Sequence, residues 1–218
     1  MSRAGAFFDM DRTVVRTNTG PSYLAYAFRH GRMRKRHVAV GLWWAFLYKL
    51  TVLDTERAMD KAIAAMAGTG DRDLQVFCRT WFEDEVKPEI SGYARRAIEL
   101  HRRRGDVLVL LTASSTYAAR PVAEHLGMDH VLATRVEVMD GTLTGRAIDP
   151  PCIGEGKVFW AEQLAREHDI DLDRSAFYTD SVHDMPMLLR VGFPVIVNPD
   201  FRLARLARAK GWRIERWS

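Results

Sequence analysis

The chain has 218 residues, of which 47% are apolar, and it carries a formal net charge of +4 at a pI near 9.2. This length allows one main domain with an insertion, and repeats and low-complexity tracts are absent. The two cysteines, Cys78 and Cys152, lie far apart and outside any C-x-x-C pattern, which favours a reducing compartment and excludes a disulfide framework or a zinc site. The basic charge permits nucleic-acid binding, but no recognition motif accompanies it, so we expect no nucleic-acid partner.

The first predicted element is the apolar run of residues 4–8, which reads as a buried strand followed at once by Asp9 and Asp11. Successive side chains on a strand face opposite ways, so these carboxylates share one side only if the chain continues extended or one of them uses its backbone. An Asp after a strand is commonly a turn former or helix cap. The alternative, which we favour, is a metal-loaded phosphoryl-transfer site. The motif also arrives before any signal-peptide segment could form, so we expect a cytoplasmic protein.

Residues 17–87 form the next predicted unit, because they show helical periodicity without strands. The periodicity breaks at Gly31, at residues 51–54 and at residues 68–70, which indicates about four helices. A helical insertion directly after the first strand is well placed to close over a site. We therefore predict a helical cap at residues 17–87 and a core of residues 1–16 and 88–218; a purely structural subdomain is the less favoured alternative.

Within this insertion, basic residues lead into an uncharged, aromatic-rich run at residues 38–48. The run is shorter than the roughly 20 residues that span a bilayer. Residues 32–48 suit an interfacial helix or a lipid-accepting wall, which would give peripheral membrane contact. We favour a cap helix buried against the core or against a partner subunit, as in a homodimer.

After residue 90 the pattern alternates between helix and strand, which predicts an α/β fold with a doubly wound parallel sheet. A β-hairpin with an Asp-Gly turn is expected at residues 136–144. The predicted helices span residues 92–104, 115–126, 157–168, 185–190 and 201–209. The predicted strands span residues 106–111, 131–134, 175–179 and 193–197.

Hydroxyl residues end the second core strand, a continuous aliphatic run at residues 107–111. Thr112 or Ser114 could bind a phosphate at the tip of this strand. The simpler interpretation is that one of them is the N-cap of the helix that follows.

Two more motifs follow in the core. Lys157 stands where a loop gives way to a helix, and Asp180 and Asp184 follow the strand ending at residue 179. A single lysine in such a place is usually a surface residue, so the signal depends on the four motifs occurring together and in order.

Four motifs stand at the ends of predicted elements in this order: Asp9 with Asp11, Thr112, Lys157, and Asp180 with Asp184. This series of motifs resembles that of the haloacid dehalogenase superfamily of aspartate-nucleophile phosphohydrolases. The helical insertion after the first motif resembles its phosphoserine-phosphatase-like group. The resemblance implies a Rossmann-like core and a Mg²⁺-dependent phosphomonoester hydrolase that forms an aspartyl-phosphate on a small organic phosphate.

By this resemblance Asp9 is the nucleophile and Asp11 is the general acid and base. Lys157 holds the phosphoryl oxygens and offsets the charge of Asp9, while Thr112 and Ala113 bind the same phosphoryl group.

The resemblance also implies a metal site. Asp9 and Asp180 would coordinate Mg²⁺ through side chains and Asp11 through its backbone carbonyl, with Asp184 direct or through water.

Three departures from phosphoserine phosphatases bear on the substrate. Asn18 stands where those enzymes typically have a glutamate for the substrate ammonium, Ala113-Ser114 replace two glycines, and His183 replaces an asparagine. These changes suggest the same chemistry with a different leaving group, for which histidinol phosphate is one candidate. Two alternatives are a membrane-surface lysolipid-phosphate phosphatase, supported only by residues 32–48, and a non-catalytic phosphate-binding protein, which would be expected to lack one of the four motifs.

Overall fold

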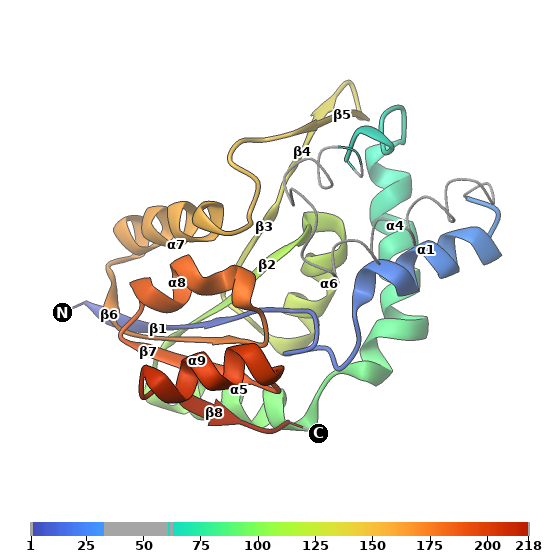
Figure 1. Cartoon of the computed structure of the whole chain (residues 1–218). Coiled ribbons are helices and arrows are strands. Elements are labelled where there is room, and N and C mark those ends of the chain that lie inside the picture. The colour runs from blue at the N-terminus through green and yellow to red at the C-terminus, as the bar shows by residue number, and fades with distance from the viewer. Residues whose placement is uncertain (1, 33–60, 62, 218) are drawn as a thin grey trace.

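A six-stranded parallel sheet lies at the centre of the protein, with the strand order β3-β2-β1-β6-β7-β8 (Figure 1). This computed structural model describes residues 2–32, 61 and 63–217. The strands are β1 (Arg3–Phe8), β2 (Val107–Ser115), β3 (His130–Thr134), β6 (Ile170–Thr179), β7 (Phe193–Val197) and β8 (Arg213–Glu215).

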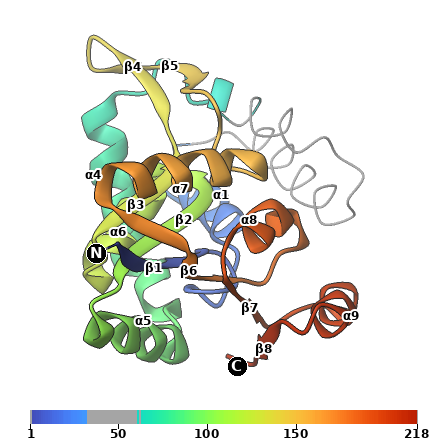
Figure 2. The same ribbon diagram turned by 90° about the vertical axis from the view of Figure 1, so that its left-hand side faces the viewer.

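Helices cover both faces of this sheet. Helices α5 (Gly92–Arg104) and α6 (Thr116–Leu126) contribute buried residues to one apolar cluster. Helices α7 (Glu155–His168), α8 (Met185–Arg190) and α9 (Phe201–Ala209) contribute to a second cluster. Figure 2 shows α5 and α7 on opposite sides of the sheet. The predicted α/β, doubly wound, Rossmann-like fold is therefore confirmed.

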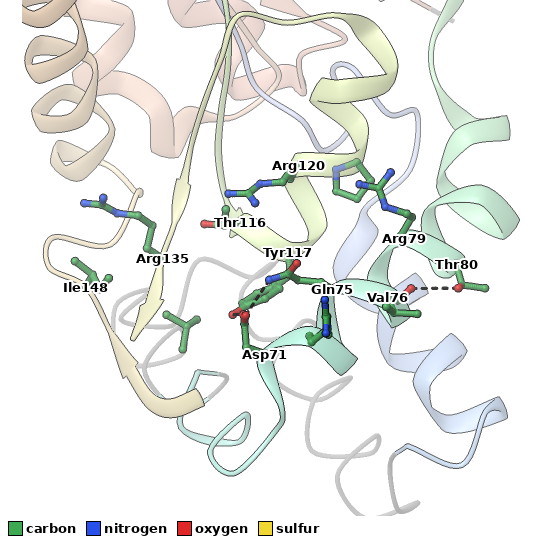
Figure 3. Close-up of a pocket in the computed structure, with 13 residues that line it drawn as sticks. Asp71, Gln75, Val76, Arg79, Thr80, Thr116, Tyr117, Arg120, Arg135 and Ile148 are labelled. Atoms are coloured by element: carbon green, nitrogen blue, oxygen red, sulfur yellow. Dashed lines mark hydrogen bonds between the residues drawn. The ribbon is translucent and has the colours of Figure 1, made fainter. Parts of the chain in front are cut away.

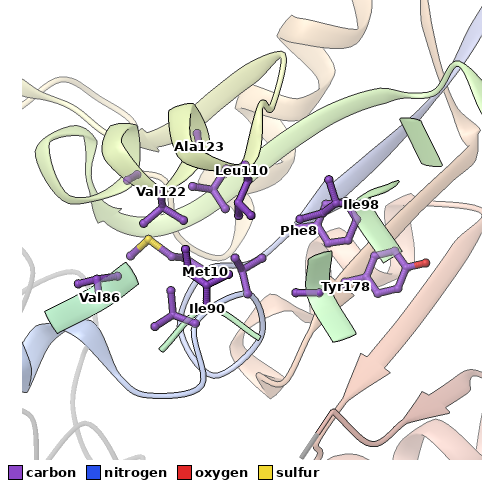
Figure 4. Packing of buried hydrophobic residues seen from close by; sticks show 14 of the residues in the cluster. Phe8, Met10, Val86, Ile90, Ile98, Leu110, Val122, Ala123 and Tyr178 are labelled. Atoms are coloured by element: carbon purple, nitrogen blue, oxygen red, sulfur yellow. The ribbon is translucent and has the colours of Figure 1, made fainter. Parts of the chain in front are cut away.

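The side chains of β1 alternate between the two clusters. Ala6, Phe8 and Met10 pack into the cluster beneath α5 and α6, whereas Phe7 packs into the other. Phe8 stacks on Tyr178 with ring centroids 4.6 Å apart, and Figure 4 shows both rings beside Ile98. Burying a side chain of this size contributes about 1.5–3 kcal/mol. Met10 is fully buried, so the core fixes the chain between the two acidic residues that flank it.

The predicted helices and strands beyond residue 90 are present, within one or two residues of most expected ends. Strand β6 begins five residues earlier than predicted, at Ile170, because its first half is polar and gives no apolar run. Ser175 secures this half: its hydroxyl accepts from the Gly5 amide at 2.8 Å and donates to the Asp171 carbonyl at 2.6 Å. The short edge strand β8 was not predicted.

The predicted hairpin is confirmed as β4 (Val136–Met139) and β5 (Thr142–Ala147). Asp140 and Gly141 have φ values of 49° and 73°, the left-handed backbone that a tight hairpin turn requires. The hairpin stands out beyond the sheet in Figures 1 and 2. It contacts the predicted insertion, because Leu143 accepts from the Gly68 amide and donates to the Thr69 carbonyl, each at 2.9 Å.

The described part of the predicted insertion contains α1 (Thr19–Arg29), α4 (Asp71–Trp81), the π-helical turn η1 (Phe82–Val86) and the 3₁₀ turn η2 (Lys87–Glu89). Side chains of α1 bind η1 directly. The Ser22 hydroxyl donates to Glu85 at 2.7 Å, and the Tyr26 hydroxyl donates to Asp84 at 2.6 Å. The uncharged run at residues 38–48 lies outside the described residues. Among the helices that are described, none is both long and apolar enough to cross a bilayer.

His101 provides a test of how polar groups stabilise the core. It is 5% exposed, and its ring contacts Asp106 at 2.7 Å and the Tyr178 hydroxyl at 2.9 Å. We expect His101→Phe to lower the free energy of unfolding by about 2–4 kcal/mol, because the buried Tyr178 hydroxyl and the partly buried Asp106 carboxylate lose their partner. Urea denaturation measures this change.

Glu99→Ala is the control on the same helix. Glu99 forms ion pairs with Arg102 and Arg103, whose side chains are 41% and 76% exposed. Exposed pairs of this kind are worth about 0–1 kcal/mol. A loss in His101→Phe no larger than that in Glu99→Ala would contradict the assigned role of His101.

Candidate active site

The predicted site residues gather at the carboxyl ends of the central strands. Asp9 follows β1 and Asp180 follows the neighbouring strand β6. Strands β2 and β3 extend the sheet to one side of β1, and β6, β7 and β8 extend it to the other, while the covering helices change face. Such a switch point leaves a crevice outside the strand ends, where α/β sheets bind ligands.

Lys157 joins two acidic residues in the buried part of this site. Its Nζ atom lies 2.8 Å from Asp9 Oδ1 and 2.7 Å from Asp184 Oδ1, and the lysine side chain is 2% exposed. Burial alone would lower the pKa of Lys157, but the carboxylates of Asp184 and Asp9 outweigh it and raise the pKa above its ordinary value. Lys157 is therefore a permanent cation in contact with Asp9.

The loop before Lys157 needs a glycine to reach this position. A Cβ atom on Gly156 would lie 1.9 Å from the Pro151 carbonyl oxygen, which no side chain could tolerate. The Gly156 amide instead donates to the Ile153 carbonyl at 2.8 Å. This close turn starts α7 and directs Lys157 into the site.

Asp9 is largely buried, but 10% of its side-chain surface remains exposed to solvent. Burial raises the pKa of Asp9 well above its ordinary value, Lys157 opposes this shift, and the carboxylates of Asp184 and Asp180 add to it. The site thus holds more negative charge than Lys157 alone offsets.

Both oxygens of the Asp11 side chain accept hydrogen bonds. Oδ1 accepts from the Thr19 amide at the start of α1, and Oδ2 accepts from the Ser114 hydroxyl at 3.1 Å. Burial raises the pKa of Asp11, although these hydrogen bonds act to lower it. A carboxyl group with a raised pKa suits proton donation.

Thr112 and Ser114 lie in the last part of β2, and neither caps the next helix. The N-cap of α6 is Ser115, so the interpretation of Thr112 or Ser114 as the cap is wrong. Thr112 is 1% exposed, and its hydroxyl accepts from the Ser114 amide at 3.1 Å. The Ala113 carbonyl accepts from the Thr134 hydroxyl at 2.9 Å. The contact from Ser114 to Asp11 was not anticipated from the sequence.

Arg12 is a second site residue that the sequence interpretation missed. Its Nε atom lies 3.2 Å from Asp180 Oδ2. Burial raises the pKa of Asp180 to about 6; Arg12 opposes the shift, and Asp184 and Asp11 add to it. The signal available in the sequence was a basic residue directly beside the Asp9 and Asp11 pair.

The donor set at this end of the sheet fits a hard divalent cation. Asp9 and Asp180 offer carboxylate oxygens, the ligand type that Mg²⁺ prefers. In residues 2–32, 61 and 63–217, no three His, Cys, Asp or Glu side chains meet as a complete metal-binding group. A cation here would therefore complete its shell with main-chain, water and substrate oxygens, as Mg²⁺ commonly does. Burial and neighbouring carboxylates raise the pKa values of Asp9 and Asp180, and a cation bound here would oppose both shifts.

Comparison with known proteins identifies the family. The family model for haloacid dehalogenase-like hydrolases matches residues 6–189. The chain belongs to this family. A phosphoserine phosphatase of Mycobacterium tuberculosis is 32% identical over 97% of this chain and 70% of its own length. A histidinol-phosphatase of Neisseria meningitidis is 28% identical over 96% of both chains.

Two solved structures share the fold of this chain. A Bordetella pertussis protein of unknown function has a TM-score of 0.90 and 28% identity over 98% of both chains. A phosphoserine phosphatase in a phospho-aspartyl intermediate analogue has a TM-score of 0.70 and 19% identity, over 98% of this chain and 93% of that one. The prediction of a haloacid dehalogenase phosphatase that resembles phosphoserine phosphatases is confirmed.

Arg12 generates a prediction about strain at the site. Its φ of 57° is left-handed, which costs a non-glycine residue about 1–2 kcal/mol. Arg16 is the comparison on a residue of similar exposure: its side chain is 55% exposed, against 54% for Arg12, and it pairs with Glu89 at 3.4 Å and donates to the Pro88 carbonyl at 3.1 Å. We expect the free energy of unfolding of Arg12→Gly to exceed that of Arg16→Gly by about 1 kcal/mol in metal-free urea denaturation. The reason is that only the substitution at residue 12 relieves backbone strain. The reverse order would show that the ion pair with Asp180 outweighs the strain.

Proposed function

We propose that this protein is a Mg²⁺-dependent phosphomonoester hydrolase that works through an aspartyl-phosphate on Asp9. One observation carries the proposal: Asp9 sits at the end of β1 in direct contact with the buried cation Lys157, with the hydrogen-bonded carboxyl of Asp11 two residues away. The arrangement supplies a nucleophile, a charge partner and a proton donor in one place.

In the first step, an Asp9 carboxylate oxygen attacks phosphorus in line, and the bond from phosphorus to the leaving oxygen breaks. Asp11 gives its proton to that oxygen, because an alkoxide is a poor leaving group. Lys157 donates to the phosphoryl oxygens and offsets the charge of Asp9, while Thr112 and Ala113 bind the same phosphoryl group.

In the second step, Asp11 acts as the base. It takes a proton from a water molecule, whose oxygen attacks the aspartyl-phosphate. The bond between phosphorus and the Asp9 oxygen breaks, which releases inorganic phosphate and restores the carboxylate. The contacts from Thr19 and Ser114 keep Asp11 in one place through both steps.

Asp9 and Asp180 would hold Mg²⁺ through side chains, and Asp11 would do so through its carbonyl, since both of its side-chain oxygens are engaged. The Asp184 oxygens are engaged as well, by Lys157 at 2.7 Å and by the Thr179 hydroxyl at 2.6 Å. We therefore propose that Asp184 positions Lys157 and reaches the metal through water. When bound, the cation offsets the negative charge of phosphate and carboxylates.

The proposed substrate is a small organic phosphate other than phosphoserine. The Asn18 side chain caps α1 by accepting from the Gly20 amide at 3.0 Å, so this position offers no carboxylate to an ammonium group. The amide of the next residue, Thr19, donates to Asp11, so the first turn of α1 contacts the proposed acid. The histidinol-phosphatase among the relatives makes histidinol phosphate the first candidate.

A cytoplasmic location remains part of this proposal. The alternative of a lysolipid-phosphate phosphatase depends on residues 32–48, of which only Arg32 is described.

Substitution of the two acids tests the mechanism. Asp9→Asn is expected to abolish hydrolysis of p-nitrophenyl phosphate. It should also prevent formation of the adduct between the Asp9 carboxylate oxygen and beryllium trifluoride, which mass analysis detects. Asp11→Asn is expected to lower turnover by about 10²–10⁴-fold, the usual contribution of a general acid and base, while phosphate binding persists. Asp173→Asn is the control, because that side chain is 86% exposed and pairs only at the surface with Arg190.

Near wild-type turnover by Asp9→Asn would refute the mechanism. Full activity after exhaustive treatment with EDTA would refute the metal requirement separately. A protein that binds phosphate but releases none from any substrate would support the non-catalytic alternative instead.

Substrate preference is tested by comparing kcat/KM for phosphoserine, histidinol phosphate and a lysolipid phosphate. We expect phosphoserine to have a lower value than histidinol phosphate, because Asn18 supplies no charge for its ammonium group. Asn18→Glu is expected to bring the kcat/KM for phosphoserine closer to that for histidinol phosphate. A phosphoserine value well above the others would contradict the argument from Asn18.

A further inference from the structure

A pocket of about 480 Å³ lies apart from the candidate active site, where α4, α6 and residues 135–148 meet. Figure 3 shows Asp71 and Tyr117 joined across it by a hydrogen bond, which measures 2.6 Å. Its volume falls in the range of about 300–1,000 Å³ that is typical of small-molecule sites. None of the proposed catalytic or metal-binding residues lines it. The proposed mechanism gives this pocket no role.

Four arginines line the pocket: Arg72, Arg79, Arg120 and Arg135. Among the described residues that line the pocket, Asp71 is the sole acidic one, and it is already engaged by the Tyr117 hydroxyl and by Gln75 at 2.9 Å. The lining therefore carries a clear excess of positive charge.

Three of these guanidinium groups form no ion pair with a carboxylate in the described part of the chain. Arg79 pairs with Glu124 at 2.7 Å, and Arg135 stacks over the Trp160 ring at 4.1 Å, a contact that does not use its N–H groups. Arg72 and Arg120 form no ion pair with any carboxylate in the part of the chain that the structure describes. Unpaired guanidinium groups that face one cavity suit a carboxylate or phosphate, which they bind with two parallel hydrogen bonds.

The pocket also offers an apolar surface. Val76 is 62% exposed and Ile148 is 40% exposed, and both line the pocket beside the buried side chains of Pro121 and Val136. Pockets for small organic ligands combine such apolar walls with a few converging polar groups. The occupant that fits this lining has an apolar or aromatic body and a doubly charged anionic group.

We propose that this pocket binds a small organic dianion, such as an aryl or alkyl phosphate or dicarboxylate, at a site separate from the candidate active site. Arg72 on α4 and Arg120 on α6 hold the anionic group, and Val76 and Ile148 contact the apolar body. Because the walls come from both the predicted insertion and the core, the bound anion joins α4 to α6. Helix α6 begins directly after β2, and the hydroxyl of Ser114 near the end of that strand donates to Asp11.

Isothermal titration calorimetry of the full chain with phenylphosphonate tests this site. The phosphonate cannot be hydrolysed, and EDTA is present throughout. We expect Arg72→Ala/Arg120→Ala to weaken binding at least about tenfold, since a hydrogen bond to a charged group is worth roughly that factor or more. Val76→Glu places a negative charge in the same pocket and is expected to weaken binding to a similar extent. Inorganic phosphate, which lacks the apolar body, should bind more weakly than phenylphosphonate.

The matched control is Arg202→Ala/Arg205→Ala, which removes two exposed arginines from α9 at the opposite end of the sheet (Figure 1). We expect its affinity to equal that of the wild type. Equal affinities in the wild type and both pocket variants, no binding to the wild type, or inorganic phosphate binding as tightly as phenylphosphonate would each overturn the proposal. Because metal is absent and no turnover is measured, the result is independent of the proposed function.

Discussion

The ammonium group of Lys157 is removed from water and lies between the carboxylates of Asp9 and Asp184. Removing such a charge from water costs several kcal/mol, and only close, well-directed partners offset that cost. Asp184 has a second partner in the Thr179 hydroxyl, which fixes the carboxylate that in turn fixes the lysine. The geometry of the site therefore depends on this chain of buried contacts, which joins the ends of β1 and β6 to the start of α7.

The sheet order makes these contacts possible. Residues 9 and 157 are distant in sequence, yet β1 and β6 are neighbours, and α7 leads directly into β6. Phe8 and Met10 are buried in one cluster and Phe7 in the other, which fixes the face of the sheet that each side chain occupies. Asp9 is then the first side chain beyond the paired part of that strand. Packing well below the site thus determines where the proposed nucleophile points.

The sequence predicted most of the core because each core element carries a strong local signal. The aliphatic run of β2 and the Asp140-Gly141 turn are signals that depend only on near neighbours. Strand β8 and the first half of β6 were missed because they are short or polar and are held by pairing with strands that are remote in sequence. For these segments, tertiary contacts outweigh local preference.

The candidate site likewise contains residues that local motifs predicted and contacts that depend on the folded chain. The carboxylates, Lys157 and the hydroxyl of Thr112 follow from motifs at element ends. The contact between Ser114 and Asp11 spans 103 positions, and the ion pair between Arg12 and Asp180 depends on a left-handed backbone at a residue that is not glycine. No local pattern encodes either contact. The arginine-lined pocket was likewise invisible, since its walls meet only in the folded chain.

The β4–β5 hairpin lies in the chain between Thr112 and Lys157, and three main-chain hydrogen bonds tie residues 68–71 to residues 141–143. Main-chain bonds of this kind depend on register and hardly on side-chain identity. The hairpin also shares a buried apolar cluster with the predicted insertion, in which Leu143 packs with Ile63 and Leu74. Main-chain register and side-chain packing therefore both couple the hairpin to the predicted insertion, and a change of length in one has to be matched by the other if these contacts are to persist.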